Sequence, residues 1–120
     1  MAAKILVVED EFLIRLSLTE ALADAGFAVT DAETADVALP LLQSGKFDLL
    51  ITDIQLPGTM NGADLARAAR TKQPALPIIY ISGCPADHTP LSPYDLYIGK
   101  PYEPEDLCRA ARRMVDTAMA

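Results

Sequence analysis

The chain has 120 residues, of which 51% are hydrophobic, and 17 acidic side chains against 10 basic ones give a net charge of −7. This length and apolar content suit one domain with one core, and the negative charge argues against direct binding to nucleic acid. No apolar run approaches the roughly 20 residues of a membrane span, and acids follow the first run where a signal peptide would stay hydrophobic. We therefore expect a cytoplasmic protein.

The first half of the chain is predicted to contain two strand–helix units. Residues 4–8 form a short apolar strand, and residues 11–25 carry apolar side chains at helical spacing. Residues 27–31 form a second strand. A second helix follows over residues 35–45, and Thr34 can cap its first turn.

The second half continues the same alternation. Residues 48–52 and 77–82 form the third and fourth strands, and a helix opened by Asn61 or Gly62 lies between them. The apolar strands and amphipathic helices therefore alternate along the chain.

The segment after the fourth strand departs from this pattern. Residues 83–95 contain three prolines and poor helical periodicity, so a helix here should be absent or limited to about one turn over residues 86–89. A weak fifth strand is predicted at residues 96–99. The last helix has Pro104 at its first position, where a proline is well tolerated.

Nearly continuous apolar strands that alternate with helices indicate a parallel sheet covered on both faces. We expect an α/β flavodoxin-like doubly wound five-stranded sheet in the order 2-1-3-4-5, with the fourth helix short or absent. In this order, a ligand binds where the C-terminal ends of strands one and three meet. Glu9, Asp10 and Asp53 occupy those two ends.

Three carboxylates in one place are costly unless a hard divalent cation neutralises them, and Mg²⁺ prefers such oxygen ligands. Ser82 and Lys100 follow strands four and five, where a hydroxyl and an ammonium could complete a phosphoryl-binding pocket. Each residue has an alternative interpretation. Glu9 and Asp10 could cap the first helix, and the other two could be ordinary strand-end side chains.

Four motifs in register, "VVEDE", "ITDIQLPG", "IIYISG" and "YIGKP", resemble the receiver domain of bacterial two-component response regulators. The resemblance covers residues 1–120 and implies a stand-alone receiver. It implies that Asp53 accepts a phosphoryl group from a sensor histidine kinase or a histidine phosphotransfer protein. It also implies Mg²⁺ ligation by Asp10, Asp53 and the backbone carbonyl of Gln55, with Glu9 acting through a bound water.

The same resemblance assigns roles to the end of the sheet. Lys100 would pair with the acids and then with the phosphoryl group, and Ser82 would hydrogen-bond a phosphoryl oxygen. Tyr97 would change rotamer together with Ser82, although an ordinary surface aromatic is the alternative. The peptide bond before Pro101 is expected to be cis.

A receiver phosphorylates and dephosphorylates itself, and we expect no independent substrate turnover. Its phosphorylated state would be read by a downstream protein that the sequence does not identify, or it would act as a phosphate relay or sink. A haloacid-dehalogenase-like phosphatase is the enzyme alternative, but that family needs an acid where this chain has Gln55. A phosphorylation-independent binding module is the other alternative. We expect the loop between Asp53 and Gly62 to be one residue longer than the loop that is common in this family.

Overall fold

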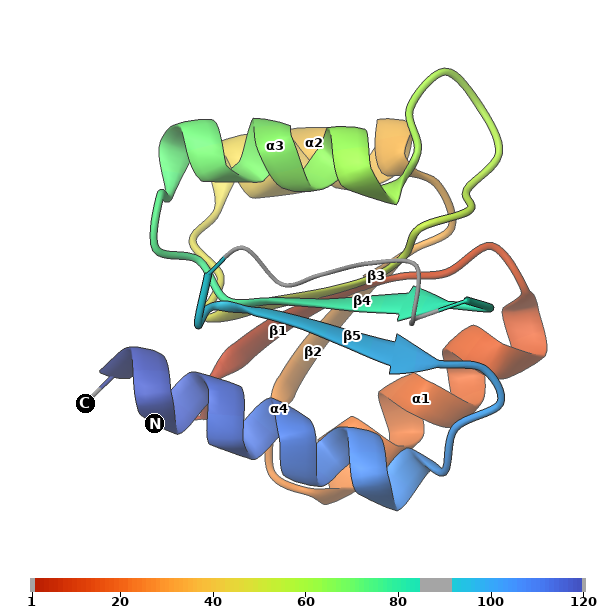
Figure 1. Ribbon diagram of the computed structural model, residues 1–120, viewed down its shortest axis with the longest axis vertical. Helices are drawn as coiled ribbons and strands as arrows, with labels where there is room; N and C mark the ends of the chain where they lie inside the picture. Colours follow the sequence, from red (N-terminus) through yellow and green to blue (C-terminus); the bar gives the residue numbers. More distant parts are fainter. Residues whose placement is uncertain (1, 85–91, 120) are drawn as a thin grey trace.

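The computed structural model describes residues 2–84 and 92–119, and these form a layered α/β fold (Figure 1). The expectation of a short or absent helix over residues 86–89 falls outside the described residues. Within the described part of the chain, no helix has both the length and the apolar character needed to cross a bilayer.

A five-stranded parallel sheet forms the centre of the fold, and its strand order is β2-β1-β3-β4-β5. This confirms the predicted order, and every strand lies within one residue of its expected bounds. The strands are β1 (Lys4–Val8), β2 (Ala28–Ala32), β3 (Leu49–Asp53), β4 (Ile78–Ser82) and β5 (Asp95–Gly99).

Helices cover both faces of the sheet, with α1 and α4 on one face and α2 and α3 on the other (Figure 1). Neighbouring residues of a strand face opposite sides of a sheet, so a strand buried on both sides supplies two cores. In β1, Ile5 and Val7 pack under α1 and α4, whereas Leu6 and Val8 pack under α2 and α3. The described helices are α1 (Phe12–Asp24), α2 (Ala35–Ser44), α3 (Gly62–Lys72) and α4 (Pro104–Met119).

Local signals set the helix ends. The Thr34 side chain accepts a hydrogen bond from Val37 N–H at 3.1 Å, as its position before α2 predicts. Asn61 and Asp64 form a reciprocal capping box at the start of α3. Gly26 adopts a positive φ of 98° just after α1, a conformation that glycine reaches without steric cost.

Candidate functional site

Acidic side chains gather at the C-terminal edge of the sheet. Glu9 and Asp10 follow β1 and Asp53 ends β3, and one carboxylate oxygen from each lies within 4.8 Å of the others. Glu9 is only 1% exposed and Asp53 3% exposed, whereas Asp10 is at the surface. The structure therefore brings together the three acids that the sequence placed at these strand ends.

Strand register explains this convergence. Val8 of β1 lies opposite Thr52 of β3, so the residues that follow each strand are neighbours. Helix α1 begins only after Glu11, whose side chain makes no capping hydrogen bond. Glu9 and Asp10 are therefore not the cap of that helix, and their carboxylates are available to the pocket.

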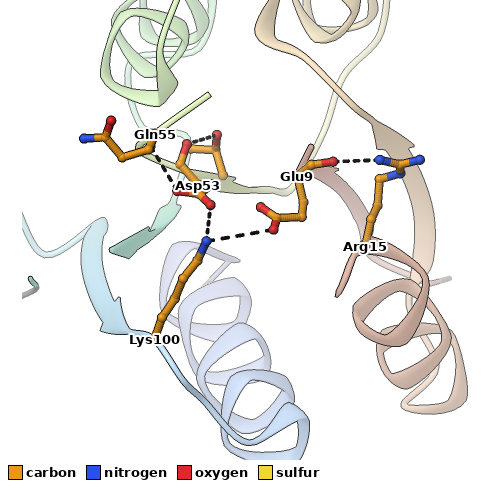
Figure 2. A network of polar contacts seen from close by, with 6 residues as sticks. Glu9, Arg15, Asp53, Gln55 and Lys100 are labelled. Atoms are coloured by element: carbon orange, nitrogen blue, oxygen red, sulfur yellow. Dashed lines mark hydrogen bonds and ion pairs between the residues drawn. The ribbon is translucent and has the colours of Figure 1, made fainter. Parts of the chain in front are cut away.

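Lys100 enters the same pocket from the end of β5. Its Nζ donates a hydrogen bond to Asp53 Oδ2 and lies 3.9 Å from Glu9 Oε1 (Figure 2). The backbone of Lys100 is anchored by its N–H, which donates to the Ser82 carbonyl at 2.9 Å. The following peptide bond, to Pro101, is cis, as the family resemblance implies.

Burial and neighbouring charges shift the pKa values of ionisable side chains in the pocket. Desolvation, followed by the neighbouring Asp53 carboxylate, raises the pKa of Glu9 to about 8. Desolvation lowers the pKa of Lys100, but the hydrogen bond and charge of Asp53 outweigh it, so the net shift is upward. Desolvation, assisted by the charges of Glu9 and Asp53, raises the pKa of Tyr102 to about 12.

The donor set fits a hard divalent cation. Both carboxylate oxygens of Glu9 are buried without a hydrogen-bond partner among the described residues. Such unsatisfied anionic oxygens are costly, and Lys100 supplies one positive charge for two buried acids. Carboxylate oxygens in this number suit Mg²⁺, which usually retains several waters beside one or two carboxylates.

Gln55 and Ser82 lie close to the acids in different ways. The Gln55 backbone N–H donates to Asp53 Oδ1 at 3.0 Å, while its side chain is exposed. Ser82 is buried at the end of β4, and its hydroxyl accepts a hydrogen bond from Cys84 N–H at 3.0 Å. The Ser82 hydroxyl is thus engaged with the following loop.

Tyr97 belongs to the packed part of the sheet. Its ring stacks on Tyr80 with 4.6 Å between ring centroids and an interplanar angle of 13°. Tyr97 packs against the core under α2 and α3, and Tyr80 in that core is only 7% exposed. Tyr97 itself is half-buried.

The loop from Asp53 to α3 is held at two points. A Cβ at Gly62 would lie 2.1 Å from the Asp53 carbonyl oxygen, so only glycine permits this approach of α3 to the acidic strand end. Thr59 Oγ1 donates to Asp36 Oδ1 at 2.9 Å, which ties the middle of the loop to α2. This loop is thus fixed against its neighbours.

Sequence reasoning missed Arg15 of α1. Its Nη1 donates to the Glu9 carbonyl at 2.8 Å, and its Nε donates to Asp31 Oδ2 at 2.9 Å (Figure 2 shows the first contact). In the sequence, an arginine within a helical pattern is interpreted as a surface side chain. Only the fold brings Arg15 beside the acidic turn, which is formed by Glu9 and Asp10 after β1.

An apolar groove of about 470 Å³ adjoins the acidic pocket on the α1 side. Helix α1 also carries three exposed apolar side chains, Phe12, Leu13 and Leu16, and Leu13 is 76% exposed. The groove is lined by Leu13, Ile14, Ser17, Leu18, Lys100, Pro101, Tyr102 and Pro104.

Comparison with protein families gives a match over most of the chain. Residues 5–112 match the family model of the response regulator receiver domain. A curated relative, the response regulator receiver protein CpdR of Brucella abortus, is 35% identical over 119 residues, which cover 96% of this chain and 98% of CpdR.

Two further comparisons concern a relative that matches over a shorter segment and a solved structure with a similar fold. The response regulator protein FleR of Pseudomonas aeruginosa is 38% identical over 82 residues, which are 68% of this chain but 17% of FleR. The chain therefore spans less than a fifth of that relative. The crystal structure of response regulator TrrA of Thermotoga maritima, in complex with Mg²⁺ and BeF, has a TM-score of 0.82 and 33% identity, covering 95% of this chain and 99% of TrrA.

Proposed function

The chain belongs to the response regulator receiver family and takes part in two-component signalling, and we propose that residues 1–120 form one receiver domain with Asp53 as its phosphoacceptor. Receiver domains are signalling proteins and not conventional enzymes, and they take phosphoryl groups from histidine kinases. In our proposal, the chain acts in the cytoplasm, and a sensor histidine kinase or a histidine phosphotransfer protein is the donor. The phosphorylated chain then changes its contacts with another protein.

The observation that carries this proposal is the environment of Asp53. Its carboxylate lies at the end of β3, bonded to the Lys100 ammonium and close to two further acids. A carboxylate is a competent nucleophile toward phosphorus when cations offset the negative charge of the phosphoryl group. Asp53 combines that position with almost complete burial of its own charge.

Receiver domains generally bind Mg²⁺ at an acidic pocket, and Glu9, Asp10 and Asp53 form such a cluster here. We infer that Asp10, Asp53 and the Gln55 carbonyl hold the ion directly and that Glu9 acts through a water. A bound Mg²⁺ supplies charge stabilisation to the transferring phosphoryl group. The complex of TrrA with Mg²⁺ and BeF supports this assignment.

In the transfer step, an Asp53 carboxylate oxygen forms a bond to phosphorus while the P–N bond to the donor histidine breaks. The imidazole nitrogen leaves with the bonding electron pair. Lys100, already bonded to Asp53, can turn its remaining N–H groups to the phosphoryl oxygens. Ser82 would exchange its contact with Cys84 for a phosphoryl oxygen, and Tyr97 would follow by changing its packing on Tyr80. Attack of water on the acyl phosphate would later regenerate the free carboxylate.

The groove beside α1 is proposed as the place where a donor protein docks. The donor histidine must come into bonding distance of Asp53, so the donor must cover the surface next to Lys100. That surface includes the apolar groove, and the exposed side chain of Leu13 in its lining suits the core of a transient interface.

Intact-mass measurement with Mg²⁺ and a small acyl phosphate such as acetyl phosphate tests the acceptor. One added phosphoryl group is expected for the wild-type chain, and none for Asp53→Asn or in EDTA. Asp24→Asn, at the exposed end of α1, is the matched control and should be modified like the wild type. Modification that persists in Asp53→Asn would refute the assignment. Absence of modification, with Mg²⁺ still bound, would favour a phosphorylation-independent binding module.

A further inference from the structure

Two backbone hydrogen bonds hold the buried acid Glu9, one at each of its peptide groups. Its N–H donates to the Ala32 carbonyl at 3.1 Å, and its carbonyl accepts from Arg15 Nη1 at 2.8 Å. The side-chain oxygens of Glu9 have no hydrogen-bond partner among the described residues. The backbone contacts therefore fix the position from which the Glu9 side chain extends, and the charged group that its carboxylate faces is the Lys100 ammonium, 3.9 Å from Oε1.

Arg15 is itself fixed from two sides. Its Nε donates to Asp31 Oδ2 at 2.9 Å at the end of β2, and the guanidinium lies 5.6 Å from the centre of the Phe12 ring. Its side chain is only 13% exposed. A planar guanidinium with two directed donors can hold a carboxylate and a carbonyl at once, which a single ammonium group does less well.

We propose that Arg15 is a positioning residue for the acidic turn, and that it prepares Glu9 and Asp10 to receive a divalent cation. The Glu9 carbonyl belongs to the peptide group that joins these two residues, so holding this oxygen fixes the orientation of both. Without that contact, repulsion among the carboxylates favours a turn in which they move apart. Arg15 opposes this opening from outside the pocket, through the backbone.

The proposal rests on the proposed function, because it assumes that the acids bind Mg²⁺. Residues that orient metal ligands from outside typically contribute about 10- to 100-fold to metal affinity. We therefore expect Arg15→Met to weaken Mg²⁺ binding at least about 10-fold. At high Mg²⁺ concentration, the final extent of phosphorylation of Arg15→Met by a small phosphodonor should stay close to that of the wild type.

Isothermal titration calorimetry with Mg²⁺ alone, on the full chain, measures this affinity without any phosphoryl transfer. Circular dichroism verifies folding of each variant. Arg112→Met is the matched control: it removes the same charge, and with it a guanidinium that lies 4.3 Å from the centre of the Phe27 ring. Its Mg²⁺ affinity should equal that of the wild type.

Arg15→Lys separates positioning from charge, and it decides the question if Arg15→Met does not fold. We expect Arg15→Lys to bind Mg²⁺ nearly as weakly as Arg15→Met, because the charge remains while the two directed contacts are lost. Wild-type affinity in Arg15→Lys, or an equal loss in Arg112→Met, would overturn the proposal. A wild-type chain that binds no Mg²⁺ would instead refute the proposed function.

Discussion

Lys100 reaches past a whole strand to bond with Asp53: the lysine follows β5, the aspartate ends β3, and β4 lies between them. One ammonium thus serves two buried carboxylates, since Glu9 Oε1 is also 3.9 Å from its Nζ. Without a bound metal ion, the acidic side chains of the pocket outnumber its one ammonium group. This excess of acids should lower the free energy of unfolding by an amount that can be measured.

Asp53→Asn is expected to raise the melting temperature of the protein in EDTA. The substitution removes a carboxylate that helps to raise the pKa of Glu9, so Glu9 can ionise more readily and pair with the Lys100 ammonium. Relief of repulsion among buried acids should add about 1–2 kcal/mol to the free energy of unfolding. Differential scanning calorimetry measures it, with the exposed Asp24→Asn as control. A lower melting temperature would mean that the Lys100 bond outweighs the repulsion.

Lys100→Met should act in the opposite direction. Removing the ammonium leaves Glu9 and Asp53 buried without a basic partner, and we expect the free energy of unfolding in EDTA to fall by about 1–3 kcal/mol. The same substitution in an Asp53→Asn background should cost less by about 1 kcal/mol or more, because residues in contact are coupled. Urea unfolding of the four proteins measures this difference. Additive effects would show that the two side chains do not interact in solution.

The titration of Glu9 predicts how stability depends on pH in the absence of metal. Its pKa is about 8 in the folded chain against an ordinary value of 4.5, so between these values the folded state retains a proton that the unfolded state has lost. The stability associated with this proton is present in full below pH 4.5 and is lost as the pH rises through 8.

Unfolding in EDTA should therefore become easier from about pH 5.5 to 8, by roughly 1 kcal/mol per pH unit. Glu9→Gln does not titrate and should remove this dependence, whereas the exposed Glu20→Gln should keep it. Denaturant titrations at a series of pH values provide the measurement. An equally steep loss in Glu9→Gln would assign the dependence to another group.

The sheet and the acidic cluster were predictable because both follow from short-range pattern and topology. Strand order 2-1-3-4-5 places the ends of strands one and three together, so Glu9, Asp10 and Asp53 converge once the order is known. A hydrogen bond from a side chain to a backbone carbonyl produces no recognisable pattern in the sequence. The hydrogen bond from Arg15 to the Glu9 carbonyl depends on the direction of one side chain, which periodicity does not report.

The stack of Tyr97 on Tyr80 shows another limit of the sequence pattern. Both residues lie in strands and occupy paired positions, Tyr80 in β4 and Tyr97 in β5. Residues of β5 are half-buried, so alternation of polar and apolar positions is weak there. Pairing of neighbouring strands in register, which requires the structure, identifies the two rings as partners.

Leu13→Gln tests whether the groove beside α1 receives a donor protein. Leu13 lines the groove and is 76% exposed, so the substitution should leave folding intact while removing apolar contact area. Loss of a central apolar contact costs about 1–2 kcal/mol at a protein interface, which predicts a 5- to 30-fold rise in the KM for a histidine kinase or phosphotransfer donor. The rate with a small acyl phosphate should not change, because that donor needs no docking surface.

Val37→Gln is the matched control for this experiment. Val37 is a similar apolar side chain, 49% exposed on α2, on the opposite face of the sheet from α1. Transfer from the same protein donor to Val37→Gln should match the wild type. If Leu13→Gln also reacts normally with the protein donor, docking occurs elsewhere. If both donors react slowly with it, Leu13 acts on the acceptor site itself and the groove is not a docking surface.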